Sequence, residues 1–452
     1  MAQQHMDMKI VDTVGDYGLM PVPEEQQKSN LNVMLVSAGW IIAISSLYIG
    51  GTLGLSMPFG EAVRAAILGQ LIVAVIATLM GMLGAKYKVS TTLIARQAFG
   101  RHGSAIFGLV AAISLGIGWF AWQASFFGMT INTIFGANNF WLFEPKVASI
   151  WGGLLMFLTA YYGYKGLAAL SYIAIPLIII LSTFGVTLAV ESFGGNLHSI
   201  ADAQPISSRI SLIAAISSVM GGSIAGGIFF PDITRYVRGG YIKGALCAGL
   251  GYFIGGIFCI ICGIIMSASV SIPGVGDVAN IPAIMQALGL GIGGLMVLIL
   301  GQWTTNDNNL YTGSLGLINV FNIPKKLAVV IMAAIGITIS AMNIQDYFVP
   351  FLIFLGTYIP PLAGVVLVDH WIFRGLLMRD SYEFGVRTEY SKWNIVALIS
   401  ALLGGYISTI IKIEYVSLLS ILIAGAIYLL IILVLRVAGI KNYTIGKWTE
   451  GA

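Results

Sequence analysis

Apolar runs of about 20 residues recur along the whole chain, and they restrict its fold more than any other feature. A helical run of this length matches the thickness of a bilayer. Hydrophobic residues make up 58% of the 452 residues and charged residues only 9%, whereas soluble domains carry about a quarter charged residues. The strands of a membrane barrel would alternate over shorter stretches. The sequence therefore predicts an all-α integral membrane protein embedded in a lipid bilayer.

Hydropathy and helix-breaking residues predict about twelve spans. These are residues 33–53, 62–85, 104–135, 147–165, 168–190, 210–235, 241–268, 286–314, 327–343, 347–368, 393–411 and 416–437. Of the 23 Lys and Arg residues, 19 fall on the same side as the amino terminus, and the others are Arg64, Lys146, Arg209 and Lys412. Because cytoplasmic loops are rich in Lys and Arg, both termini are predicted to be cytoplasmic. Residues 1–32 lack an apolar core, so they predict a cytoplasmic tail and no cleaved signal peptide.

One polar cluster interrupts the apolar pattern, at residues 301–310 (Gly-Gln-Trp-Thr-Thr-Asn-Asp-Asn-Asn-Leu). Polar groups inside a membrane persist where they face a bundle interior or a watery cavity, and they indicate function. On a helix Thr304 and Asn308 share a face, as do Thr305 and Asn309. Their hydroxyl and carbonyl oxygens suit a small alkali cation. The alternative is a polar helix end that reaches the water interface.

Glycines cluster in two spans, at Ser45–Gly54 in the first and at Gly221–Gly227 in the sixth. If the first ten spans form two halves of five, these are the opening helices of the two halves. Gly-interrupted spans in corresponding positions indicate a transporter with inverted repeats, whose broken helices line a binding site. We therefore predict a break within each stretch. The alternative is that the glycines only allow helices to pack closely.

The third span carries an aromatic residue and an amide on one helix face. Trp119 and Gln123 lie four residues apart, with Trp122 next to them. An indole offers a flat stacking surface, and a glutamine amide offers a donor and an acceptor. Together they suit a planar heterocycle with polar groups on its edge. The alternative is that these aromatic residues serve packing or the interface.

Other classes of protein fit the sequence less well. Cys259 and Cys262 have the spacing of a redox pair but no further Cys or His beside them, so they are interpreted as buried small side chains. An enzyme would need a catalytic constellation, and the candidate carboxylates, Asp307 and Asp346, have no histidine partner. A channel would need a filter or a charged ring. The net charge of +4 comes from residues between the spans, so no nucleic-acid partner is predicted, and no obligate protein partner is evident.

With these residues, the chain resembles the purine/cytosine permeases of the nucleobase–cation symporter family over nearly its whole length. The supporting motifs are Gly50–Gly54, Gly84 to Gly100, Gly118–Phe120 and Asp232–Tyr236. The most specific one is Trp303-Thr-Thr-Asn-Asp-Asn308 with the following Leu-Tyr, which looks like a motif of the bacterial cytosine permeases.

The resemblance implies two inverted five-helix repeats of the leucine-transporter type plus two accessory helices. The transport core would be residues 33–372, and residues 373–452 would hold a cytoplasmic loop, the accessory helices and a tail. The implied function is sodium-coupled import of a nucleobase such as cytosine or a purine across the cytoplasmic membrane. The alternative is a proton-coupled permease, using Asp307, for a ring of the hydroxymethylpyrimidine, hydantoin or allantoin type.

The resemblance also implies site residues. The sodium ligands would be the carbonyls of Gly39, Ile42 and Gly301 and the hydroxyls of Thr304 and Thr305. The substrate residues would be Trp119, Gln123, Gly222, Ser223, Asn306 and Asn309. Cytosine permeases carry glutamine where this chain has Gly116 and phenylalanine where it has Ser223. We therefore expect a pocket wider than a cytosine pocket, in which Gln123 replaces the hydrogen bonds lost at Gly116.

Overall fold

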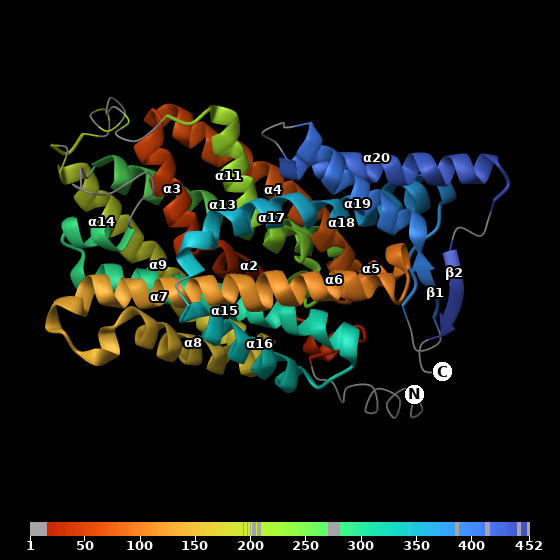
Figure 1. Cartoon of the computed structure of the whole chain (residues 1–452), viewed down its shortest axis with the longest axis horizontal. Helices are drawn as coiled ribbons and strands as arrows, with labels where there is room; N and C mark the ends of the chain where they lie inside the picture. Colours follow the sequence, from red (N-terminus) through yellow and green to blue (C-terminus); the bar gives the residue numbers. More distant parts are fainter. Residues whose placement is uncertain are drawn as a thin grey trace.

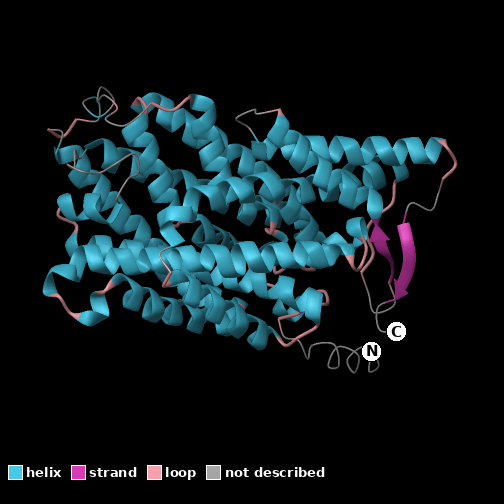
Figure 2. Ribbon diagram, in the orientation of Figure 1, coloured by secondary structure: helices cyan, strands magenta, loops and turns pink. Residues whose placement is uncertain are grey.

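The computed structural model describes residues 16–192, 194–196, 198, 200, 205, 209–269, 281–342, 344–384, 388–411, 416–440 and 444–449, and most of them are helical (Figure 2). The elements of the first half are η2 (Glu24–Gln26), α2 (Asn30–Ile41), α3 (Ile44–Ser56), α4 (Phe59–Tyr87), α5 (Thr91–Phe99), α6 (Gly103–Ala111), η3 (Ala112–Trp119), α7 (Phe120–Phe135), η4 (Gly136–Asn138), η5 (Trp141–Phe143), α8 (Pro145–Tyr161) and α9 (Tyr164–Ser192). Those of the second half are α11 (Leu212–Ile228), α12 (Pro231–Thr234), α13 (Tyr241–Ser269), α14 (Ile281–Ala287), α15 (Gly291–Phe321), α16 (Lys325–Ser340), η6 (Ile344–Tyr347), α17 (Phe348–Tyr358), α18 (Pro360–Leu367), η7 (Val368–Met378), β1 (Glu389–Asn394), α19 (Ile395–Ile410), α20 (Val416–Val437) and β2 (Thr444–Thr449).

Every predicted span overlaps one or more helices in the described residues. By length and composition, seven helices within that part of the chain are able to cross a membrane, or up to nine if each of two bent pairs is one span. Ile395–Ile410 is a shorter apolar helix. The chain is therefore a multi-pass membrane protein, and the number twelve stays a prediction.

The first span is broken, but not where its glycines predicted. α2 ends at Ile41, α3 begins at Ile44, and the two helices bend by 53°. The predicted stretch Ser45–Gly54 is helical throughout. A Cβ on Gly54 would lie 2.5 Å from the carbonyl oxygen of Ile264 in α13. The prediction of a break within that stretch is therefore wrong, because these glycines let the backbones of α3 and α13 approach closely.

The sixth span differs from its prediction in the same way. α11 continues without interruption through Gly221–Gly227. A Cβ on Gly226 would lie 2.5 Å from the hydroxyl of Tyr252, and one on Gly227 would lie 3.2 Å from a methyl group of Val73. The predicted break is wrong here too, since the stretch packs against α4 and α13 as an intact helix.

α15 runs through the interior of the bundle and brings the polar cluster with it. It packs against α6, η3, α7, α8, α9 and α16. In Figure 1 α6 and α7 form one long rod (orange) beside α15, and α20 (blue) lies along one edge. α19 and α20 pack on each other and on α18. This position agrees with accessory helices, while the inverted-repeat relation and the domain boundaries stay predictions.

Two short strands depart from the all-α prediction. β1 and β2 pair antiparallel, and Figure 2 shows them (magenta) at one end of the bundle. The backbone N–H groups of Arg101 and His102 donate to two carbonyls of β1, at 2.8 and 2.9 Å. The prediction of a mostly helical membrane protein was correct. It was wrong for this pair of strands, because two strands far apart in sequence leave no local signal of their pairing.

The segment before the first span is folded against the bundle. The backbone N–H of Lys28 donates to the carbonyl of Tyr236 (2.6 Å). The fully buried guanidinium of Arg235 donates to the carbonyls of Asp16 and Tyr17, both at 2.8 Å. The described residues 16–29 therefore contribute to the packed structure, whereas the sequence showed only their polar composition. Their cytoplasmic location stays a prediction.

Candidate functional site

The break between α2 and α3 leaves backbone carbonyls without helical partners. The carbonyl of Trp40 accepts a hydrogen bond from the hydroxyl of Thr305 (3.3 Å), and that of Ile41 accepts one from a serine hydroxyl of α3 (2.8 Å). The carbonyls of Gly39 and Ile42 have no hydrogen-bond donor among the described residues. Irregular backbone inside a membrane is tolerated where it lines a cavity. These two carbonyls are therefore available to a ligand.

α15 approaches the break at Gly301. A Cβ on Gly301 would lie 3.4 Å from the carbonyl oxygen of Ile42. The hydroxyls of Thr304 and Thr305 both donate to the carbonyl of Gly301, at 3.2 and 2.8 Å. The structure thus brings four of the five predicted sodium ligands to the same place, the junction of α15 with the broken helix.

The fifth predicted ligand, Gly39, lies in the last turn of α2 and faces α9. A Cβ on Gly39 would lie 2.9 Å from the hydroxyl oxygen of Ser171. The five predicted ligand atoms are carbonyl and hydroxyl oxygens, which suit a hard alkali cation. No group of three His, Cys, Asp or Glu residues able to hold a metal ion occurs in the part of the chain that the structure describes. The residues fit sodium, and their role as ligands stays a prediction.

A small cavity adjoins the break. Its lining residues are Trp40, Ile41, Ala43, Ser45, Leu115, Trp119, Gly222, Gly226, Tyr252, Thr305 and Asn309. Three predicted substrate residues, Trp119, Gly222 and Asn309, are therefore brought together beside Thr305. The cavity has a volume of about 20 Å³, which is room for about one water molecule. The cavity has to widen before it can hold a nucleobase-sized ring.

Side chains from neighbouring helices fill the space beside Gly222 and Gly116, where the sequence predicted an open pocket. A Cβ on Gly222 would clash with the side chain of Ile49 in α3. A Cβ on Gly116 would clash with Sδ of Met332 and lie 3.2 Å from Cα of Gly313. Gly116 therefore faces α15 and α16, where it lets η3 and α15 approach closely. The prediction that Gly116 widens the pocket is wrong.

The other three predicted substrate residues do not line the cavity. Asn306 turns toward α7, where its Nδ2 donates to the carbonyl of Phe120 (3.2 Å). Ser223 is buried, and its carbonyl accepts a hydrogen bond from the hydroxyl of Tyr252 (2.8 Å). Gln123 is fully buried, and neither of its amide atoms has a partner in the described part of the chain. Their roles in binding stay predictions.

Trp40 is a residue of the candidate site that sequence reasoning missed. Its indole Nε1 donates to Oδ1 of Asn309 (3.1 Å), while its carbonyl accepts from Thr305. One residue therefore connects the carbonyls at the break with an amide of the cavity. Tryptophans in apolar spans are common near the membrane interface, so Trp40 gave no specific signal.

Asp307 lies on another side of α15, facing α8. Its Oδ1 accepts a hydrogen bond from the hydroxyl of Thr159, which in turn accepts one from the indole N–H of Trp303 (2.7 Å). Its Oδ2 has no donor among the described residues, although the side chain is fully buried. Because an ionisable group is costly to bury in a membrane, Asp307 is a candidate for holding a proton.

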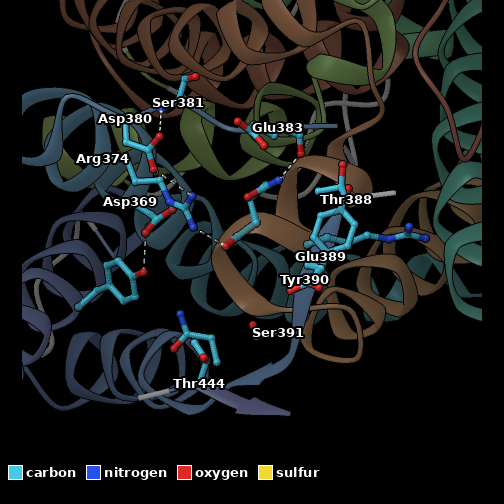
Figure 3. A pocket seen from close by; sticks show the side chains of 14 residues that line it. Asp369, Arg374, Asp380, Ser381, Glu383, Thr388, Glu389, Tyr390, Ser391 and Thr444 are labelled. Carbon is cyan, nitrogen blue, oxygen red and sulfur yellow. Dashed lines mark hydrogen bonds and ion pairs between the residues drawn. The ribbon is translucent and has the colours of Figure 1, made fainter. Parts of the chain in front are cut away.

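A larger cavity of about 460 Å³ lies where η7, α5, β1 and α20 meet (Figure 3). Arg374 pairs there with Asp369 (3.2 Å) and, at 3.8 Å, with Asp380. The hydroxyls of Tyr382 and Tyr428 donate to the two oxygens of Asp369, at 2.8 and 2.6 Å. These contacts tie η7 to α20 and satisfy the buried carboxylate, so the cluster serves structure and the candidate site is the one at the break.

Comparison with known proteins confirms the predicted family. Residues 21–430 match the family described as permease for cytosine/purines, uracil, thiamine, allantoin. The cytosine permease of Escherichia coli (strain K12) is 32% identical over 386 residues, which cover 85% of this chain and 86% of that protein. The hydantoin permease of Microbacterium maritypicum is 24% identical over 334 residues, covering 69% and 67%.

A solved structure shows the same fold. It is that of Mhp1, a nucleobase-cation-symport-1 family transporter, in a closed conformation with bromovinylhydantoin bound. The TM-score is 0.79 at 18% identity, covering 94% of this chain and 96% of that one. The sequence match, the fold and the apolar helices agree. The chain belongs to the family of permeases for cytosine/purines, uracil, thiamine and allantoin, and it is a membrane transporter and not an enzyme.

Proposed function

We propose that this transporter is a sodium-coupled symporter that imports a nucleobase-like ring, such as cytosine or a purine, across the cytoplasmic membrane, with both termini in the cytoplasm. The similarity to a cytosine permease supports the substrate class. The observation that supports coupling between sodium and ring binding is the double contact of Trp40 with α15, at Thr305 and Asn309.

The proposed sodium site uses the oxygens at the break. Its ligands would be the carbonyls of Gly39, Ile42 and Gly301 and the hydroxyls of Thr304 and Thr305. Sodium there would supply a positive charge that draws α2 and α15 together, because its ligands come from both helices. The same contact would hold Trp40 against α15 and so fix the position of the Asn309 amide.

The proposed ring site lies next to these oxygens. Trp119 would supply the stacking face, and Asn309 would hydrogen-bond to the ring edge. Gly222 provides space if the side chain of Ile49 moves away from it. Ser223, Asn306 and Gln123 do not line the cavity, and they would complete the hydrogen bonding once the cavity widens. Access would alternate as the two repeat-related bundles move against each other.

Proton coupling is the second candidate function, and Asp307 is the observation that favours it. Its carboxyl is fully buried and has one oxygen without a donor among the described residues. A proton on that oxygen would remove the charge from the membrane interior. The ring would then be of the hydroxymethylpyrimidine, hydantoin or allantoin type, as in the relative named as a hydantoin permease.

Uptake into vesicles separates the two candidates. Purified protein would be reconstituted, and accumulation of labelled cytosine, hypoxanthine and hydantoin measured with an inward sodium gradient or an inward proton gradient. We expect that one of these rings accumulates, and that it does so with the sodium gradient and not with the proton gradient. Accumulation driven by the proton gradient alone, and lost in Asp307→Asn, would favour the second candidate. A lack of accumulation under both gradients would overturn the proposed function.

A further inference from the structure

Two buried glutamines near the cavity have unused hydrogen-bonding groups. Gln123 in α7 and Gln302 in α15 are both fully buried. Neither the carbonyl oxygen nor the amide nitrogen of either side chain has a partner among the described residues. Buried side-chain amides are nearly always hydrogen-bonded, so two such side chains in adjacent helices indicate a ligand.

The direction of Gln302 follows from its neighbours on α15. Successive residues of a helix turn by about 100°, so Gln302 projects between Asn309, seven residues later, and Asn306, four residues later. Asn309 contacts Trp40 in α2, and Asn306 contacts the carbonyl of Phe120 at the start of α7. Gln302 therefore faces the region between α2 and α7. Along α15 it lies about one turn before Thr305, which lines the cavity.

Gln123 lies at the same level on the opposite wall. α15 runs antiparallel to η3 and α7, since Asn306 contacts Phe120 while Gly313 contacts Gly116 further along. One turn before Asn306, α15 comes level with the turn of α7 that follows Phe120. That turn holds Gln123. The two amides are thus on facing helices at one depth.

A short helix with an apolar buried face, α14, packs near the start of α15. α14 packs against α3, α7 and α15, and Met285 in α14 lies 3.1 Å from the place of a Cβ on Gly294, near the start of α15. The buried residues of α14 are Ile281, Pro282, Ile284 and Met285. The buried side chains of α14 are apolar and offer no hydrogen bonds, so a ligand bound between α7 and α15 would supply the partners that the two glutamines lack.

We propose that Gln302 is a specificity-determining residue that, together with Gln123, binds the polar edge of the ring. This inference rests on the proposed function. A carboxamide presents a donor and an acceptor side by side, and it matches a ring edge that carries a C=O next to an N–H. A ring without such an edge leaves the buried amides unpaired and is rejected. Trp119 lies one turn from Gln123 and supplies the stacking face of the same site.

The test is a binding panel on detergent-purified full-length protein. Dissociation constants for cytosine, uracil, hypoxanthine and hydantoin would be compared with those for pyrimidine and unsubstituted purine, which have no carbonyl. In Gln302→Met we expect the tightest carbonyl-bearing ring to weaken by about tenfold or more, and the carbonyl-free rings to change by less than about threefold. The preference between the two groups would therefore shrink.

Two further variants make the result interpretable. Gln302→Leu removes the acceptor and the N–H donors without adding an ionisable group, so it decides the question if Gln302→Met does not fold, with the same loss of preference expected. Gln70→Met is the control, because Gln70 is a buried amide in α4 that already donates to the carbonyl of Tyr252 (3.1 Å). We expect it to lower the melting temperature without changing the order of the rings.

The outcomes separate this inference from the proposed function. If every Gln302 variant that folds keeps the wild-type affinities and the wild-type order of the rings, the inference is overturned and the proposed function stands. If no ring binds the wild-type protein in sodium or in choline, the proposed function itself is overturned, and the role of Gln302 with it.

Discussion

The indole nitrogen of Trp40 lies 3.1 Å from the amide oxygen of Asn309, and the carbonyl of the same tryptophan accepts a hydrogen bond from Thr305. Thr305 and Asn309 are one helical turn apart on the same face of α15. α2 therefore holds α15 at two successive turns, one beside the oxygens at the break and one beside the cavity. This contact would be the physical route by which a cation at the break changes the affinity for a ring, as the proposed function requires.

Replacing Trp40 with phenylalanine tests that route. Trp40→Phe keeps an aromatic ring and the backbone carbonyl but removes the N–H that Asn309 accepts. An unsatisfied buried acceptor costs about 1–3 kcal/mol, so we expect ring binding to weaken by about fivefold or more. We also expect the ratio of ring affinities in sodium and in choline to fall toward one, as measured by calorimetry.

Trp151→Phe is the matched control for that experiment. The indole of Trp151 in α8 donates to the carbonyl of Leu142 (3.0 Å), far along the chain from the break. The variant loses the same kind of hydrogen bond, and its sodium-to-choline ratio should equal that of the wild type. If Trp40→Phe also keeps the wild-type ratio, Trp40 does not carry the coupling.

The hydroxyl of Thr305 should be required for the effect of sodium. Thr305→Val keeps the shape of the side chain and removes a predicted ligand, so we expect ring binding to become indifferent to sodium. Thr130→Val is the control, since the buried hydroxyl of Thr130 in α7 already donates to the carbonyl of Phe126 (2.9 Å). Titration of each variant with sodium at fixed ring concentration gives the answer. Sodium dependence that survives in Thr305→Val would remove this residue from the site.

The sequence predicted the ingredients of the site better than their arrangement. The adjacent hydroxyls of Thr304 and Thr305 were recognisable because polar oxygens in an apolar helix are rare, and they do lie at a broken helix. The position of the break was not predictable: Trp40 to Ile44 contains no glycine or proline. The glycines that suggested breaks instead serve close packing, which requires knowledge of the neighbouring helix.

The directions in which the side chains of α15 point could not be predicted from the sequence either. Asn306 and Asn309 are three residues apart and looked interchangeable, yet one contacts Phe120 and the other contacts Trp40. Which residue faces the cavity depends on how α15 is rotated relative to its neighbours, and a single sequence does not contain that rotation. The same applies to Gly116, which faces Met332 and not the cavity.

Close packing of α3 on α13 makes a stability prediction. In Gly54→Ala the new Cβ would lie 2.5 Å from the carbonyl oxygen of Ile264, so the two helices have to separate. Overpacking of this kind costs about 1–3 kcal/mol, and we expect a lower melting temperature in detergent. Gly60→Ala is the control, because a Cβ on Gly60 meets nothing within 4 Å. An equal melting temperature for the two variants would contradict the packing.

The segment before α2 is predicted to be stabilised mainly by Arg235. This buried guanidinium donates to the carbonyls of Asp16 and Tyr17 and to the hydroxyl of Tyr311 (2.6 Å). Arg235→Met removes these hydrogen bonds, and a hydrogen bond to a charged group contributes about 1.5–3 kcal/mol. We expect a lower melting temperature and faster proteolysis of residues 16–29. Arg64→Met, at an exposed position of α4, should show neither change.

The most direct test of the account is the mutual effect of sodium and ring on each other's binding in the wild-type protein. Coupling is a free energy shared by the two sites, so each ligand has to tighten the other by the same factor. We expect this factor to be about fivefold or more. The same factor should be obtained from the ring affinity in sodium compared with choline and from the sodium affinity with and without the ring. A ring that binds equally well in sodium and in choline would contradict it.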